Sequence, residues 1–291
     1  ESVAGWDEAR VIERLRGEAG DPVRVRVARI GLSEPLELTV TRENIHVPPV
    51  LAYRTGDVAV VQLSQFSREA VDELRAAIDR LVGEGAARLV LDLRGNPGGL
   101  LEEGVAVSDL FLPPGAPIVT TASRVEDQNY EFLAEQKAAF PDLPMTVLID
   151  GASASASEIV AGALQDHDRA LVLGAPSFGK GSMQTVYLLP GGHHLKLTTA
   201  AWYTPSGRSI QRARSDGDVG SMPEAPMMVH DPAAIDGTVP EPADTTSREV
   251  FHTDAGRPVY GGGGIVPDRI IPDSVGDAER RLGAELKRNK L

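Results

Sequence analysis

Apolar and polar residues alternate with two different periods along this chain, and the two periods predict a mixture of helices and strands. Strict alternation over residues 23–29 and 36–40 is typical of half-buried strands. Apolar residues recur at helical spacing over residues 6–16, and again between Ser67, which we expect to cap that helix, and Gly83. The first block of about 45 residues is too short to enclose a core of its own.

Beyond residue 57, predicted strands and helices follow one another in turn. This alternation implies a layered α/β core with parallel strand pairs. Residues 214–249, rich in Asp, Pro, Gly and Met, break the pattern and predict a surface insertion. The fold is expected to resume near Phe251, and residues 277–291 are expected to form a closing amphipathic helix. The remaining strands are predicted over 57–66, 89–93, 117–122, 145–150, 170–174, 185–189 and 195–203, and the remaining helices over 100–111 and 156–165.

Composition narrows the class of protein. The 291 residues, 42% of them hydrophobic, suit one large globular domain or one domain with a fragment of another. No apolar run approaches the ~20 residues of a membrane-spanning helix. The net charge of −13 argues against binding to nucleic acid or to an anionic membrane. Because the chain starts at Glu1 with no targeting segment, we expect it to be part of a longer protein.

The first candidate for chemistry is the run Ser153-Ala-Ser155-Ala-Ser157, directly after the strand predicted at 145–150. Small residues allow a sharp turn from strand to helix, which exposes a serine beside the first helical N–H groups. That arrangement suits Ser155 as a nucleophile with an oxyanion site. Taken alone, the stretch fits a flexible Ala/Ser loop or a helix N-cap better than an active site.

The second candidate is Lys180, which lies between Gly179 and Gly181 and between two apolar strands. Desolvation there would lower the pKa of the amine and make it a base near neutral pH. The alternative is a surface lysine in a turn. Only five of the 29 basic residues are lysines, which weakens that alternative. Arginine, unlike lysine, stays protonated at working pH.

Two other motifs overlap this segment and are disfavoured. Residues 174–180 match the start of a phosphate-binding loop, but Gly181 stands where Ser or Thr would hold magnesium. Ser177 and Lys180 match the S-x-x-K of penicillin-recognising enzymes, but the companion motifs S-D-N and K-T-G are missing.

Glycines in the run from Asp92 to Gly99 allow close approach to a ligand, so a main-chain N–H there is a candidate second oxyanion donor. The same run also fits a tight strand-to-helix turn. A Ser–His–Asp triad is disfavoured, since there is no G-x-S-x-G and none of the six histidines lies in a known partner motif. The chain has no cysteine, which excludes disulfides, a thiolate zinc site and a cysteine nucleophile, and it has no H-E-x-x-H.

Five blocks of the chain stand out together, at residues 91–100, 153–159, 177–184, 203–208 and 262–268. In this order they resemble the carboxyl-terminal processing peptidases, also called tail-specific proteases. The resemblance implies Ser155 as nucleophile, Lys180 as general base, and Gln184 as the residue that orients the lysine. It also implies oxyanion donors at the N–H groups of Gly99 and Ala156, and no cofactor or metal. The implied fold is α/β (α+β), a layered core like those of crotonase and the Clp peptidase.

The resemblance also divides the chain into two domains. Residues 1–46 are similar to the C-terminal half of a PDZ domain, whose carboxylate-binding loop would precede residue 1. Residues 47–291 would form the protease core with its insertion at 214–249.

This organisation implies a serine endopeptidase that cleaves polypeptides near their C-termini through an acyl-enzyme. Its substrates would be unfolded or extended chains with apolar C-termini. Its location would be extracytoplasmic, periplasmic or at the cell envelope of a bacterium, and it would form a homo-oligomer or use an adaptor protein.

Two alternatives stay open. In the first, the chain is an inactive or resting-state peptide-binding scaffold of the same family, with Ser155 and Lys180 apart. A separation near 3 Å between hydroxyl and amine would favour the enzyme. In the second, a weaker alternative, the chain is a crotonase-like acyl-CoA enzyme, which would turn over thioesters without proteolysis.

Overall fold

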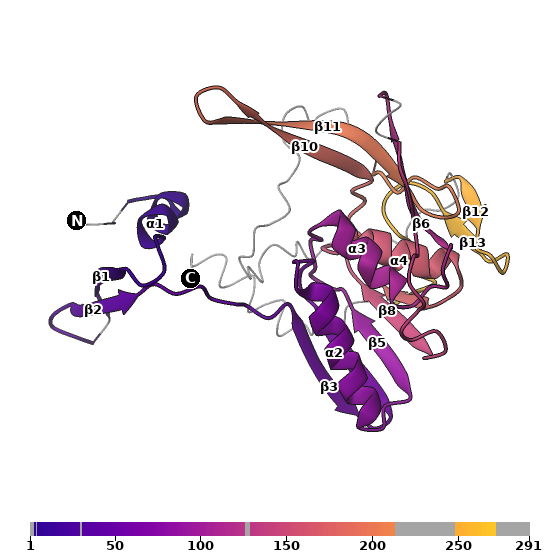
Figure 1. Cartoon of the computed structure of the whole chain (residues 1–291), viewed down its shortest axis with the longest axis horizontal. Coiled ribbons are helices and arrows are strands. Elements are labelled where there is room, and N and C mark those ends of the chain that lie inside the picture. Colours follow the sequence, from indigo (N-terminus) through magenta and orange to yellow (C-terminus); the bar gives the residue numbers. More distant parts are fainter. Residues whose placement is uncertain (1–2, 4, 30, 126–128, 213–247, 272–291) are drawn as a thin grey trace. The chain divides into compact units, whose positions relative to one another are not determined.

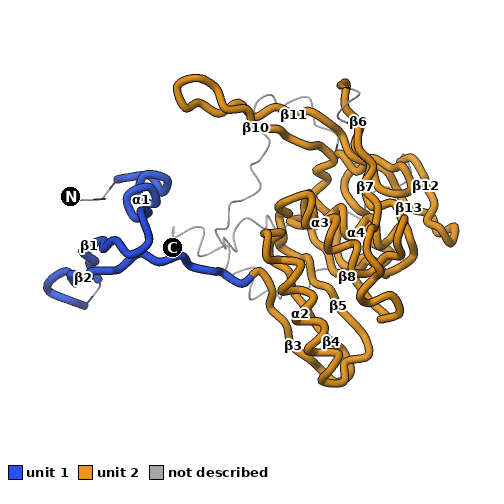
Figure 2. The backbone as a smooth tube through the Cα atoms, viewed as in Figure 1, with its two compact units in different colours: residues 1–48 blue, residues 49–291 orange. Residues whose placement is uncertain are grey.

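The computed structural model describes residues 3, 5–29, 31–125, 129–212 and 248–271. They fall into two compact units, residues 1–48 and residues 49–291 (Figure 2). The helix predicted at 277–291, and all of the predicted insertion except residues 248–249, lie outside the described residues.

The first unit contains helix α1 (Glu8–Leu15) and an antiparallel pair of strands, β1 (Pro22–Val27) and β2 (Leu36–Thr41). Asp7 caps the helix by accepting a hydrogen bond from the N–H of Arg10. None of the described residues up to 48 is buried. The expectation that this block encloses no core of its own is therefore confirmed.

The second unit is built on a mixed sheet of six strands among the described residues (Figure 1), in the order β14-β9-β8-β5-β4-β3. Strand β3 is antiparallel to β4, and all other neighbouring pairs are parallel. The central strands are rich in buried aliphatic residues, as expected for a parallel sheet covered on both faces. The strands are β3 (Val50–Thr55), β4 (Val58–Leu63), β5 (Arg88–Asp92), β8 (Met145–Ile149), β9 (Leu171–Gly174) and β14 (Arg269–Ile270).

Helices α2 (Ala70–Gly83) and α4 (Ala156–Asp166) pack on this sheet, and α3 (Leu101–Asp109) packs against both of these helices. Helix α2 contacts β3 and β4, whereas α4 contacts α3, β9 of the main sheet and β6 of a second sheet. Every residue of α4 is buried, so its ends are held by protein on all sides. The predicted layered α/β core with parallel strand pairs is confirmed.

The second sheet is antiparallel, with the order β10-β11-β6-β7 among the described residues. Its longest strands form a hairpin whose tip projects from the rest of the sheet (Figure 1) and exposes Leu188. Strands β12 and β13 pair as a separate hairpin. The strands are β6 (Pro117–Ser123), β7 (Glu131–Leu133), β10 (Ser182–Leu189), β11 (His193–Tyr203), β12 (Val250–His252) and β13 (Pro258–Tyr260).

One expectation about α2 was wrong, and one strand of the main sheet was not predicted. Ser67 does not cap the helix: Glu69 occupies that position, and the Ser67 hydroxyl is buried with no hydrogen-bond partner in the part of the chain that the structure describes. The chain makes a turn from Ser67 to Ala70 first, closed by the Ser67 carbonyl. Strand β3 was not predicted, because the Pro48-Pro49 pair before it reads as a connection.

Candidate active site

Ser155 lies at the N-terminal end of helix α4, in the sharp turn that follows strand β8. Its main chain has φ 56° and ψ −115°, a conformation that costs a non-glycine residue about 1–3 kcal/mol. Apart from Asp168, no other non-glycine residue in the described ranges has a positive φ. The fully buried Ser153 fixes this turn to the end of β5, because its hydroxyl donates to the carbonyl of Leu93 (2.8 Å). The predicted strand-to-helix turn at Ser155 is confirmed.

A second turn, from Asp92 to Gly99, packs directly against Ser155. A Cβ atom on Gly98 would lie 2.8 Å from the Cβ of Ser155, and one on Gly99 would lie 2.2 Å from the carbonyl oxygen of Phe66. Both glycines have positive φ, so a side chain at either place is excluded by space and by conformation. The buried Asn96 accepts, through its main-chain carbonyl, from the Ser157 hydroxyl (2.9 Å), which ties this turn to α4.

The main-chain N–H groups around Ser155 differ in what they bind. The N–H of Gly98 donates to the side-chain oxygen of Asn96 (2.9 Å). The N–H groups of Gly99 and Ala156 donate to no acceptor among the described residues. An oxyanion site requires main-chain N–H groups that are free to donate, so the assignment of this role to Gly99 and Ala156 stays a prediction.

Lys180 lies at the end of a loop, residues 175–181, that leads from β9 to β10. Its main chain is held on both sides: the N–H donates to Glu158 (3.0 Å), and the carbonyl accepts from the indole N–H of Trp202 (3.1 Å). Burial lowers the pKa of the Lys180 amine, and the positive charge of Lys196 lowers it further, while Glu158 acts in the opposite direction. The amine is thereby shifted toward the neutral form that a general base requires.

Glu158 connects the two candidate catalytic residues. Its carboxylate is fully buried and accepts four hydrogen bonds, two on each oxygen. One oxygen accepts from the N–H groups of Ser155 (2.9 Å) and Lys180 (3.0 Å). The other accepts from the N–H of Gly179 (2.7 Å) and the hydroxyl of Ser177 (2.5 Å). Burial raises the pKa of Glu158, and these four donors oppose that shift by favouring the carboxylate.

The sequence reasoning treated Glu158 only as part of a motif and gave it no role. A signal was present, because Ser155 and Glu158 have the S-x-x-E spacing of a capping box. What that spacing does not disclose is that the same carboxylate binds a loop about 20 residues later in the chain.

The structure brings Ser155, Ala156, Gly99 and Lys180 into one region but does not join the proposed dyad. No hydrogen bond connects the Ser155 hydroxyl to the Lys180 amine among the described residues, and no ion pair involves that amine there. Gln184 lies in β10 just after a bulge and pairs with Thr198 of β11. A bulge can redirect the side chains beside it, but the orienting role of Gln184 stays a prediction.

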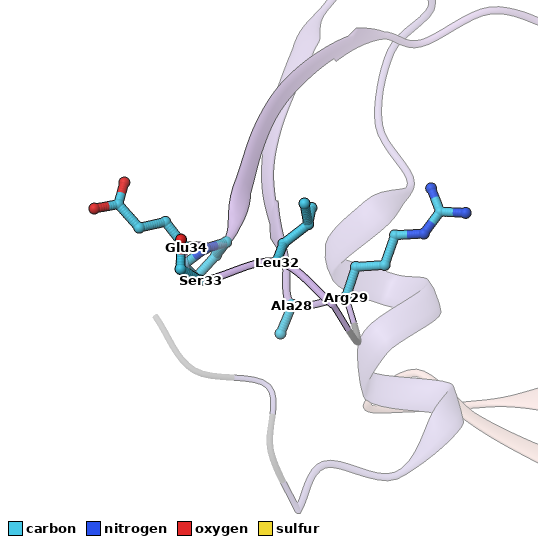
Figure 3. A pocket seen from close by; sticks show the side chains of 6 residues that line it. Ala28, Arg29, Leu32, Ser33 and Glu34 are labelled. Carbon is cyan, nitrogen blue, oxygen red and sulfur yellow. The ribbon is translucent and has the colours of Figure 1, made fainter.

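Two shallow hollows lie elsewhere. One, of about 380 Å³, is in the first unit beside the turn between β1 and β2 and is lined by Leu32 and Arg29 (Figure 3). The other, of about 320 Å³, is lined by Gln211, Phe251 and Gly262, among others. Neither contains Ser155. Within the described ranges, no group of three or more His, Asp or Glu is arranged to hold a metal, and no helix has the length and apolar character to cross a membrane.

Comparison with known proteins assigns the family. The model of peptidase family S41 matches residues 57–220. The chain is 42% identical over 213 residues to a carboxy-terminal-processing protease of Bartonella bacilliformis, covering 72% of this chain and 49% of the relative. It is 38% identical over 243 residues to a carboxyl-terminal-processing protease of Synechocystis sp., covering 82% of this chain and 54% of the relative.

The solved structure of a photosystem II D1 C-terminal processing protease is similar in fold and sequence. It has a TM-score of 0.52 and 32% identity, over 67% of this chain and 54% of that one. The chain thus spans about half the length of the curated relatives described above. The matched family model covers more than half of the 291 residues. The chain belongs to peptidase family S41.

Proposed function

We propose that this chain is the catalytic part of a serine endopeptidase that cleaves polypeptides near their C-termini. The observation that carries the proposal is the buried carboxylate of Glu158, which binds the N–H groups of Ser155 and Lys180 together. The names of the Bartonella and Synechocystis relatives support the reaction class.

The proposed reaction uses only groups of this site. Neutral Lys180 takes the hydroxyl proton of Ser155 as the serine oxygen attacks a peptide carbonyl. The N–H groups of Gly99 and Ala156 bind the oxyanion that forms. The C–N bond then breaks, the Lys180 ammonium returns its proton to the leaving amine, and water hydrolyses the resulting ester. Gln184 would orient the amine, and no metal or cofactor takes part.

The substrates we propose are extended or unfolded polypeptides with apolar C-termini, met outside the cytoplasm at a bacterial cell envelope. Residues 1–46 would be the C-terminal half of a PDZ domain, which binds peptide ends by strand addition, and residues 47–291 the protease core with its insertion at 214–249. A homo-oligomer or an adaptor protein would present such substrates.

The test is degradation of an unfolded protein by the wild type and by Ser155→Ala, with products identified by mass spectrometry. We expect cleavage close to the substrate's C-terminus by the wild type and none by the variant. Cleavage that survives Ser155→Ala would reject this mechanism. Thioester turnover without proteolysis would instead support an acyl-CoA enzyme.

A peptide-binding scaffold is the second candidate, favoured by the absence of a Ser155–Lys180 hydrogen bond among the described residues. The scaffold hypothesis predicts that the wild type and Ser155→Ala bind an extended peptide equally and that neither protein cleaves it. A longer version of the protein that includes a whole PDZ domain separates this scaffold from a resting enzyme, because only the resting enzyme would gain activity.

A further inference from the structure

The loop that carries Lys180 is held by a second charged group, Arg212, in the segment that follows β11 and the turn at residues 204–208. Its guanidinium donates three hydrogen bonds to main-chain carbonyls: to Phe178 (2.9 Å), to Ser177 (2.9 Å) and to Gly263 (3.0 Å). Its own N–H donates to the carbonyl of Gly179 (3.0 Å). Arg212 therefore binds the three residues that immediately precede Lys180.

The packing around these contacts is close. A Cβ atom on Gly179 would lie 2.9 Å from the Cβ of Arg212 and 3.0 Å from the main-chain nitrogen of Gly264. On the far side of Lys180, the N–H of Gly181 donates to the side-chain oxygen of Gln211 (3.1 Å). Residues 211–212 thus contact the loop both before and after the lysine.

Arg212 and Glu158 divide the polar groups of this loop by sign. The carboxylate accepts from N–H groups of Gly179 and Lys180. The guanidinium binds carbonyls of Ser177 and Phe178. The N–H groups of the loop thus face a negative charge and its carbonyls face a positive one. Charge-assisted hydrogen bonds of this kind are about twice as strong as neutral ones.

We propose that Arg212 is a positioning residue for the peptidase reaction: its guanidinium fixes the main chain before Lys180, and so the place from which the amine reaches Ser155. This inference rests on the function proposed above. Displacement of a reacting group by about 1 Å can cost ~100-fold in rate, so a loop held at several carbonyls affects catalysis without touching the substrate.

The chain offers a matched control in Arg169, which follows α4. Its guanidinium also donates three hydrogen bonds to main-chain carbonyls: to Phe111 (3.1 Å), to Phe140 (2.6 Å) and to Leu143 (2.8 Å). None of these residues belongs to the candidate site. Arg169→Met removes the same number of guanidinium–carbonyl hydrogen bonds as Arg212→Met, together with a cation–π contact to Phe111, and so reports the effect of general loosening.

The experiment compares the wild type, Arg212→Met, Arg212→Lys and Arg169→Met in the full chain, with two readouts. Amide hydrogen exchange of the peptide containing residues 177–181 tests the contacts and needs no activity. Kinetics on an unfolded protein substrate, as kcat, KM and their pH dependence, test the effect on catalysis.

For Arg212→Met we expect at least 10-fold faster exchange in that peptide, about a 10- to 100-fold lower kcat, and little change in KM. The acidic limb of kcat/KM should move to higher pH, because a looser loop exposes the Lys180 amine to water and returns its pKa toward the ordinary value. In Arg212→Lys, kcat should stay nearly as low as in Arg212→Met, since an ammonium lacks the planar fork that reaches several carbonyls at once.

Unchanged exchange, unchanged kcat, or the same losses in Arg169→Met would overturn the proposal. So would full recovery in Arg212→Lys, which would show that charge alone is sufficient. A wild type without Ser155-dependent cleavage would reject the proposed function instead, and the exchange of residues 177–181 would still decide whether Arg212 holds the loop.

Discussion

The two ends of helix α4 contain buried carboxylates that are satisfied in different ways. At the N-terminal end, Glu158 accepts hydrogen bonds from three main-chain N–H groups and one hydroxyl. At the C-terminal end, the buried Asp166 is paired with the fully buried Arg208 (2.7 Å). The half-buried Asp168, just beyond the helix, is paired with Arg257 (2.5 Å). Glu158 is therefore satisfied by neutral donors alone, whereas Asp166 and Asp168 each have a guanidinium partner in addition to a main-chain N–H.

This difference suggests that the N-terminal end of α4 serves catalysis and that the C-terminal end serves stability. A carboxylate paired with the Lys180 amine would raise its pKa and hold it protonated. Because four donors already occupy the oxygens of Glu158, the carboxylate can fix the loop while the amine stays unpaired among the described residues. Arg208 lies away from the candidate catalytic residues. Its ion pair with Asp166 holds the turn after β11 against the C-terminal end of α4.

The largest effect should come from Lys180 itself. Lys180→Ala and Lys180→Arg should both lower kcat/KM by at least ~1,000-fold, because neither alanine nor a permanently charged arginine accepts the serine proton. Thermal unfolding should change little, which separates lost chemistry from lost folding. Activity retained in Lys180→Ala would require another base, and a histidine would be sought.

At the opposite end, Arg208→Met should lower the free energy of unfolding by about 3–5 kcal/mol, because it leaves the carboxylate of Asp166 buried without its partner. Urea denaturation measures this effect. The exposed pair Arg26–Glu37 provides the control, since Arg26→Met should cost no more than ~1 kcal/mol. A larger fall in kcat of the folded Arg208→Met protein than in Lys180→Ala would contradict the division between the two ends.

Glu158→Gln should lower both activity and stability, each by less than the two substitutions above. The amide turns one acceptor oxygen into a donor that faces two other donors, so we expect about 1–3 kcal/mol of destabilisation and ~100-fold lower kcat. The exposed Glu102 of α3 is a matched control, and Glu102→Gln should change neither quantity. If Glu158→Gln lowered stability alone, the carboxylate would be structural only.

The smallest effect should be a shift in pH dependence caused by Lys196. Its positive charge lowers the pKa of Lys180, so Lys196→Gln should raise that pKa. Lys180 must be neutral to act as the base, and the acidic limb of kcat/KM should therefore move to higher pH. Lys196→Arg keeps the charge and should leave the limb in place. A limb that moves equally in both variants would point to packing rather than to charge.

Much of the second unit follows from local pattern. The strands at residues 89–93 and 145–150 and the helix at 156–165 were predicted within a few residues of β5, β8 and α4, because a buried parallel strand and a buried helix each have a recognisable apolar period. The short strands β7, β12, β13 and β14 were missed, since two or three residues show no period.

The sequence by itself determined the longer strands and helices of the second unit, apart from β3, and the sharp turn at Ser155, because small residues and apolar periods act within a few positions of the chain. Its prediction that residues 1–46 are part of a PDZ domain stays a prediction. Tertiary structure alone decided that Glu158 and Arg212 bind the same loop. Glu158 precedes Ser177 by 19 residues, and Arg212 follows Phe178 by 34 residues, beyond the hairpin of β10 and β11. Such contacts depend on how the chain returns after β9 and β11, and no local period encodes that return.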